Sequence, residues 1–285
     1  MGDKDYQINN FAAAFIDILG QQDQLSGCGL LPDMSVSENK IKFLDKVNKT
    51  IGIIQELHKT FDILYETYME NQAGLKVPPE MKEDYERISK TELKYQRFSD
   101  GLVLFLSLGE DSESLPVNGL FALIGVCGSL AFMGLTKKQP IRAGLDIAWG
   151  VELNDNELYG CVVSKAYRLE SIVAQYPRVV VGDEIVNYLK QLNSQVSDDV
   201  VTQYNKSLAN ICLEMIAEDY DGNYIVDYLG SAFTDFIAKE LDESAYKDAF
   251  DFVLEQEKLW KDEKHTKLVT RYHILRKYFE DKLAL

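Results

Sequence analysis

Apolar and polar positions alternate along the chain in a way that predicts a mixed α/β fold. Residues 11–18, FAAAFIDI, form a nearly continuous apolar run before Gly20, which is typical of a buried strand and a turn. Residues 39–72 carry apolar side chains three and four positions apart, and this spacing predicts a long amphipathic helix. The segments LKYQRF and LVLFLSL then flank Ser99-Asp100-Gly101, which is typical of a β-hairpin.

The order of elements extends this pattern to a sandwich. An apolar helix should cover 114–136, a strand 140–153, a helix 162–175 and a strand 178–182. This order predicts an α/β (α+β sandwich) fold of the βαββαβ type. A second Asp-Gly turn predicts a strand pair around DYDGN, and the chain turns helical from Ser231. We expect one domain over 8–230 and a helical extension over 231–285, packed on the core or on another subunit.

The helix predicted at 114–136 has an alternative interpretation. The segment carries no charge and is long enough to cross a bilayer, which would make the protein membrane-anchored. It also contains Pro116, Asn118 and four glycines, and it stands between a predicted hairpin and a predicted strand. A buried helix in a soluble protein is therefore the favoured prediction.

Charge and cysteine content narrow the class of protein. The 30 lysines and arginines face 46 aspartates and glutamates, so the net charge is −16 and binding to nucleic acid is disfavoured. A local positive pocket could still bind a small phosphorylated ligand. The four cysteines have no C-x-x-C spacing, and the first residues, MGDKDYQINN, lack an apolar secretory core. We expect a reduced, cytoplasmic protein with no membrane partner.

Two acidic residues are the first candidates for chemistry. Asp17 lies near the end of an apolar strand, and burial of an unpaired carboxylate there would be costly. Asp100 occupies the predicted hairpin turn, so the two carboxylates converge if the strand lies beside the hairpin. Two oxygen ligands facing a triphosphate suit magnesium or manganese. The alternatives are that Asp17 accepts turn amides and that Asp100 is an ordinary hairpin residue.

The helix predicted at 162–175 supplies the other candidates. Ser164 and Arg168 lie four residues apart and therefore on one face. An arginine there can stabilise charge during phosphoryl transfer, although it can also be a solvated charge paired with Glu157 or Glu170. The sequence contains no G-x-S-x-G or G-x-x-x-x-G-K-[ST] motif, which disfavours esterase and P-loop functions, and its histidines have no H-E-x-x-H or other metal-ligand spacing.

Taken together, these segments resemble a known family. FIDILG, KYQRFSDG, PIRAGLDIAWG and YGCVVSKAYRLE are similar, in order and spacing, to the class III nucleotide cyclase domain over roughly residues 8–190. The segments FIDILG, FSD, KAY-x-LE and YPR are also similar to those of the pyrimidine cyclases of bacterial Pycsar anti-phage systems.

The resemblance implies roles for individual positions. Asp17 and Asp100 match the two metal-binding aspartates, and Ile18 matches the residue that lends a backbone carbonyl. Arg168 matches the transition-state arginine, whereas Ser164 stands where the family usually has asparagine. The phosphate-binding turn matches Gly20, Gln21 and Gln22.

The positions that select the base depart from the purine cyclases. They fall on Gln96 and Glu157, which reproduce neither the lysine and aspartate common in adenylate cyclases nor the glutamate and cysteine common in guanylate cyclases. Gln96 offers both a donor and an acceptor, which suits uracil or cytosine. The family's phosphate-binding lysine has no counterpart in NYIVDYLG, so Lys165 or Arg178 is the candidate substitute.

The implied function is a pyrimidine nucleotide cyclase that converts UTP or CTP to the 3′,5′-cyclic monophosphate and pyrophosphate. Two Mg²⁺ or Mn²⁺ ions per site are expected, in a homodimer whose neighbouring subunit supplies the arginine. The resemblance also implies an anti-phage role and a separate effector that senses the cyclic nucleotide. The alternatives are a weakly active, cyclase-like nucleotide sensor and a purine (adenylate or guanylate) cyclase.

Overall fold

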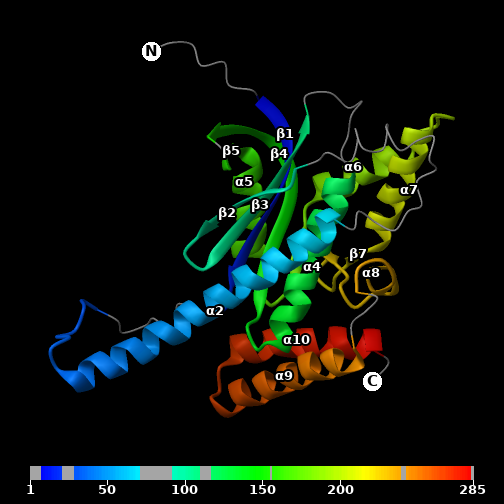
Figure 1. Cartoon of the computed structure of the whole chain (residues 1–285). Helices are drawn as coiled ribbons and strands as arrows, with labels where there is room; N and C mark the ends of the chain where they lie inside the picture. Colours follow the sequence, from blue (N-terminus) through cyan, green and yellow to red (C-terminus); the bar gives the residue numbers. More distant parts are fainter. Residues whose placement is uncertain are drawn as a thin grey trace, which may run out of the picture.

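A mixed β-sheet organises the protein (Figure 1). The computed structural model describes residues 8–20, 29–70, 92–109, 117–154, 156–238 and 242–283. The strands follow the order β2-β3-β1-β4-β6-β8-β7, and β5 pairs with β4 outside this path. β4 and β6 are parallel, and the other neighbours are antiparallel. The strands are β1 (Ile8–Ile18), β2 (Lys94–Phe98), β3 (Gly101–Gly109), β4 (Ile141–Asn154), β5 (Glu157–Gly160), β6 (Val179–Val181), β7 (Ile216–Glu218) and β8 (Tyr224–Val226).

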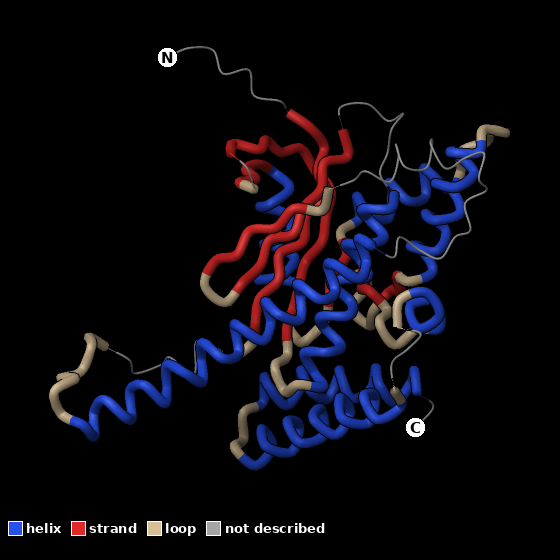
Figure 2. The backbone as a smooth tube through the Cα atoms, viewed as in Figure 1, coloured by secondary structure: helices blue, strands red, loops and turns tan. Residues whose placement is uncertain are grey.

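Helices cover the sheet on both faces, as the tube view also makes clear (Figure 2). α2 (Ser37–Glu70) and α4 (Val117–Thr136) lie on one face, and α5 (Cys161–Arg168) lies on the other. The alternation along β1 matches this division, since successive strand residues point to opposite faces. Ala12 belongs to the main core with α4, whereas Phe11 and Ala13 pack with Val162 of α5.

α4 is the apolar helix that the sequence leaves open to a membrane interpretation. Among the described residues it is the one helix long and apolar enough to cross a bilayer, and most of it is buried inside the fold. The side-chain oxygen of its buried Asn118 accepts a hydrogen bond from the Tyr204 hydroxyl at 3.1 Å. The prediction of a buried helix is confirmed for 117–136, and residues 114–116 lie outside the described part.

The C-terminal half adds helices that pack on the same core. α9 packs against α4, and α10 packs against α9. Asp227, which follows β8, accepts a hydrogen bond from the Tyr278 hydroxyl at 2.8 Å and pairs with Lys282, so α10 is tied to the sheet. The helices of this half are α6 (Asp183–Asn193), α7 (Val200–Glu214), α8 (Ser231–Phe236), α9 (Glu243–Asp262) and α10 (Thr266–Leu283).

The structure agrees with the predicted order of elements and adds to it. The strand at 11–18, the long helix, the hairpin and the strand pair around DYDGN are all present. The helix predicted over 162–175 is α5 followed by a π-helical turn, Leu169–Val173. β5, α6 and α7 are not among the predicted elements. β5 has four residues directly after a turn, which is too short to show alternation. The polar connection at 77–90 lies outside the described residues.

Candidate functional site

The two predicted metal-binding aspartates come together at one end of the sheet. β1 pairs antiparallel with β3, and Asp17 lies opposite Gly101, the residue after Asp100. The negative charge of Asp100 contributes to raising the pKa of Asp17, so the two carboxylates interact electrostatically. β1 therefore lies beside the β2–β3 hairpin, which is the condition under which Asp17 and Asp100 are expected to converge.

Asp17 is partly buried and is held by an arginine. It lies opposite Arg142 of β4, whose Nη2 donates to Asp17 Oδ2 at 3.2 Å. Burial raises the pKa of the Asp17 carboxyl; Arg142 opposes this shift, whereas Asp100 adds to it. A carboxylate whose pKa is raised by burial and by a like charge is stabilised when a cation arrives.

A second carboxylate, Glu170, shares the same arginine. Arg142 Nε lies 2.5 Å from Glu170 Oε1, and the Glu170 side chain is only 2% exposed. Burial raises the pKa of Glu170 to about 7. The positive charge of Arg142 lowers this pKa, and the negative charge of Asp17 raises it further. The suggestion that Glu170 pairs with Arg168 is wrong, because Glu170 points into the sheet and Arg168 is exposed.

The donor set at this end of the sheet fits a hard divalent cation. Asp17 and Asp100 supply two carboxylates, and Ile18, the last residue of β1, follows Asp17 directly. Glu170, which pairs with the same Arg142 as Asp17, adds a third carboxylate beside them. No group of three or more His, Cys, Asp or Glu side chains able to hold a metal is found among the described residues. A metal here therefore needs substrate oxygens and water to complete its coordination.

The predicted phosphate-binding turn is only partly described. Gly20 lies two residues after the end of β1, in a turn, and has φ 90°, in the left-handed region where a side chain is strained. An added Cβ on Gly20 would meet no atom of the described residues within 4 Å. Gln21 and Gln22 lie outside the described residues.

Arg168 and Ser164 lie on the solvent side of α5. Both are exposed, and they share one face of the helix. α5 lies tightly on the sheet because residue 144 is glycine: a Cβ there would lie 2.4 Å from the Ala166 carbonyl oxygen. The Tyr167 ring packs edge-to-face on Phe15 of β1, with centroids 5.1 Å apart. The helix therefore covers the strand that carries Asp17, but its Arg168 points outward.

The two predicted base-selecting residues lie on strands that are not adjacent, because β3, β1 and β4 separate β2 from β5. Gln96 of β2 lies opposite Val103, which faces α5, so Gln96 shares that face. Lys94, two positions earlier, forms an ion pair of 2.8 Å with Glu152 of β4. This bridge joins β2 to the β4–β5 hairpin, whose β5 begins with the exposed Glu157.

Arg178 does not serve as the missing phosphate-binding cation. Its side chain is 2% exposed and pairs with Asp219 and with Asp221, the latter at 2.7 Å. This arginine therefore anchors the β7–β8 turn to β6. Lys165 lies 3.4 Å from Asp146 and 3.8 Å from Glu184, so it too faces carboxylates of its own chain.

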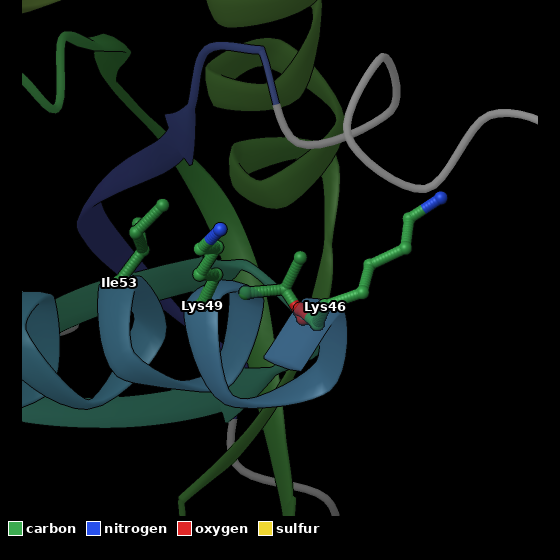
Figure 3. Close-up of a pocket in the computed structure, with 4 residues that line it drawn as sticks. Lys46, Lys49 and Ile53 are labelled. Atoms are coloured by element: carbon green, nitrogen blue, oxygen red, sulfur yellow. The ribbon is translucent and has the colours of Figure 1, made fainter. Parts of the chain in front are cut away.

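A cavity on α2 offers two other lysines. It has a volume of about 540 Å³ and is lined by Lys46, Lys49, Thr50 and Ile53. Figure 3 shows the two lysines projecting from α2 on the side where β1 ends. Lys49 also pairs with Asp45 at 2.9 Å, an exposed contact of the kind that contributes little to stability. Nothing in the sequence pattern singles these lysines out, because they look like the solvated face of an amphipathic helix.

Comparison with known proteins gives remote likenesses. No family model and no curated protein matches the chain. The chain is similar to the catalytic core of a rhodopsin-guanylyl cyclase with converted specificity, in complex with ATPalphaS (15% identity, 66% of this chain and 84% of that chain, TM-score 0.39). It is also similar to the guanylate cyclase domain of RhGC from Catenaria anguillulae, in complex with GTP (16% identity, 65% of this chain and 84% of that chain, TM-score 0.37). A bacterial light-regulated adenylyl cyclase gives 14% identity, 67% and 82% coverage and a TM-score of 0.36. TM-scores this low carry no conclusion about the chemistry of this chain.

Proposed function

We propose that this protein is a class III-like nucleotide cyclase that converts UTP or CTP to the 3′,5′-cyclic monophosphate and pyrophosphate. One observation carries the proposal. In the pairing of β1 with β3, Asp17 lies opposite Gly101 and so comes close to Asp100, 83 positions later in the sequence. Asp17 lies on the sheet face that the Arg168 helix covers. Two acids at a strand end beside an exposed arginine form a suitable site for phosphoryl transfer.

The site would be completed by a second copy of the chain. Arg168 and Glu170 lie on opposite sides of their helical segment, and Glu170 is the one directed at Asp17. Arg168 is therefore directed away from the aspartate of its own chain. A two-fold homodimer would bring it to the aspartates of its partner and form two equivalent sites. Tyr167 and Ile172, which are 53% and 61% exposed, offer apolar surface beside it.

The proposed reaction is an internal displacement on the triphosphate. The ribose 3′ oxygen bonds to the α-phosphorus while the bond to the bridging oxygen breaks; pyrophosphate leaves with that electron pair, and the hydroxyl proton passes to water. Two Mg²⁺ or Mn²⁺ ions at Asp17, Asp100 and the Ile18 carbonyl would lower the proton affinity of the hydroxyl and offset the triphosphate charge. Arg168 would neutralise charge at the α-phosphate, and Ser164 would orient the ribose.

Base selection would rest on Gln96 and Glu157. The amide of Gln96 can both donate to and accept from a pyrimidine edge. Its position on the α5 face, near the Lys94–Glu152 bridge, supports a shared role with the β4–β5 hairpin. A purine cyclase remains the alternative, since the same groups can also meet a purine edge.

Phosphate binding would fall to the turn at Gly20, Gln21 and Gln22 and to α2. Lys46 and Lys49 line a cavity on the side of α2 where β1 ends, and they are cations in a chain of net charge −16. Lysine acts on phosphate as a mobile point charge, so two lysines at the mouth of a cavity suit the distal phosphates of a nucleotide.

A nucleotide sensor without efficient turnover is the competing hypothesis, because Ser164 offers a shorter reach and fewer donors than asparagine. Purified protein should be mixed separately with ATP, GTP, CTP and UTP plus Mn²⁺, and the products identified by mass spectrometry. The proposal expects cyclic CMP or cyclic UMP. Cyclic AMP or GMP would favour the purine cyclase, and binding without any cyclic product would favour the sensor.

The biological setting is proposed on the resemblance of the sequence segments alone. The product would act as a second messenger against phage infection, produced in the cytoplasm and sensed by a separate effector protein. A cyclic pyrimidine nucleotide that rises in infected cells, and only when Asp17 is intact, would support this role.

A further inference from the structure

Among the described residues, Arg142 is the one cation that forms ion pairs with both Asp17 and Glu170. It lies in β4 directly opposite Asp17 and contacts the two acids with different atoms, Nη2 at 3.2 Å and Nε at 2.5 Å. The shorter contact is to Glu170. Glu170 is also the more deeply buried partner, since its side chain is 2% exposed against 25% for Asp17.

This sharing matters for any cation that binds Asp17. A guanidinium devoted to Asp17 would neutralise the carboxylate and occupy its lone pairs, which are the groups that a divalent metal needs. Glu170 draws the guanidinium toward itself and balances its charge. The backbone of Glu170 is held in position, because it belongs to the π-helical turn that packs against Gly144. A Cβ on residue 144 would lie 2.5 Å from the Glu170 backbone nitrogen.

We propose that Glu170 is a positioning residue for the metal site: by holding Arg142, it keeps the Asp17 carboxylate available to a divalent cation. This inference rests on the proposed function and adds a residue to it. Glu170 itself does not touch the metal or the substrate. Because it follows Arg168 by two positions, the segment that presents the arginine to the partner also sets the charge at Asp17 of its own chain.

The test is a cycle of variants in which Mn²⁺ binding is measured by the EPR signal of unbound Mn²⁺ at pH 8.5. Glu170→Gln leaves Arg142 with Asp17 alone, and we expect about a tenfold weaker affinity for Mn²⁺. Arg142→Gln removes the competing cation, so affinity should be no weaker than in the wild type. The double variant should likewise recover the wild-type affinity. Arg97→Gln breaks an ion pair with Asp62 away from this cluster and serves as the control.

A merely structural role for Glu170 would leave the double variant as weak as Glu170→Gln, and that result would overturn the inference. Unchanged Mn²⁺ affinity in Glu170→Gln would also overturn it. If Glu170→Gln fails to fold, weak binding in Arg142→Gln alone contradicts the proposal just as directly. If the wild-type protein forms cyclic nucleotide and all three variants bind Mn²⁺ as tightly as the wild type does, this inference is refuted but the proposed function is not. A wild-type protein with neither product nor Mn²⁺ binding would refute the proposed function as well.

Discussion

Asp17 occupies a position where the strand pattern favours an apolar side chain. Phe11, Ala13 and Phe15 precede it on the same face of β1, and the first two are fully enclosed. Burial raises the pKa of Asp17, and Asp100 adds to this effect, so ionisation of this residue costs free energy in the folded protein. A residue that is unfavourable for folding and surrounded by other charges is typical of a functional site.

Asp17→Asn should therefore separate activity from stability. Without the carboxylate the site loses a metal ligand, and we expect cyclic nucleotide formation to fall by about a hundredfold or more. The unfolding temperature should stay equal or rise, because repulsion within the acidic cluster is relieved. Asp62→Asn, which changes an exposed carboxylate of α2, is the matched control. Unchanged turnover in Asp17→Asn would remove the metal assignment.

The α2 lysines can be tested in the same assay. Lys46→Gln combined with Lys49→Gln should raise KM for the triphosphate several-fold to about tenfold, with little change in kcat, because exposed charge contacts are individually weak. Lys42→Gln changes another lysine of the same helix, which pairs with Glu38 at 2.6 Å outside the cavity, and should have no effect. Equal KM values in the two variants would exclude the cavity as the phosphate site.

At the scale of elements, the sequence predicts much of the frame. Apolar runs and Asp-Gly turns are local signals, so β1, the hairpin and the strand pair at β7 and β8 are predictable. α6 also carries a local signal, since the acidic residues of its first turn precede buried positions spaced like a helix, yet no element is predicted between the strand ending at 182 and the strand pair around DYDGN. The pairing of Arg142 with Glu170 is different. It depends on how tightly α5 and the turn after it lie on β4, and no local pattern encodes that distance.

Gly144 sets this close packing of α5 on the sheet. In Gly144→Ala the new methyl would lie 2.4 Å from the Ala166 oxygen and 2.5 Å from the Leu169 Cβ, both parts of rigid elements. We expect destabilisation by about 1–3 kcal/mol and a larger loss of activity than of fold, since Glu170 and Arg168 both shift. Urea unfolding and product assays measure the two effects. Gly52→Ala, in open space on α2, is the control, and equal effects of the two substitutions would contradict the packing argument.

The β7–β8 turn is held by charge and should respond to acid. Burial alone would raise the pKa of Asp221, but hydrogen bonds from Arg178 and Asn223 lower it overall. A lowered pKa in the folded state means that this stabilisation is complete above the ordinary pKa of 3.8 and is lost as pH falls through the lower, folded value. Asp221→Asn should therefore lower the free energy of unfolding at pH 7 by about 1–3 kcal/mol. The difference from wild type should shrink below pH 4 or so; a difference independent of pH would contradict this account.

At the scale of the whole molecule, the proposed chemistry is divided between two copies. Each chain carries Asp17 on the sheet face that α5 covers and Arg168 on the outer side of the same helix. The charge of −16 does not oppose substrate binding if divalent cations accompany the triphosphate. The candidate site residues and their division between two subunits are both expected from the resemblance of the sequence segments. The structure adds that Arg168 is exposed, whereas Glu170, two positions later, is buried against Arg142.

Mixing two inactive variants tests this division most directly. Asp17→Asn lacks the metal ligand and Arg168→Ala lacks the arginine, so each homodimer should be inactive. After the subunits exchange, half of the dimers carry one variant of each kind, and each of these has one intact site. The account predicts recovery of about a quarter of wild-type cyclic nucleotide formation. Activity of the mixture no higher than the sum of the separate variants, in the presence of an active wild type, would contradict it.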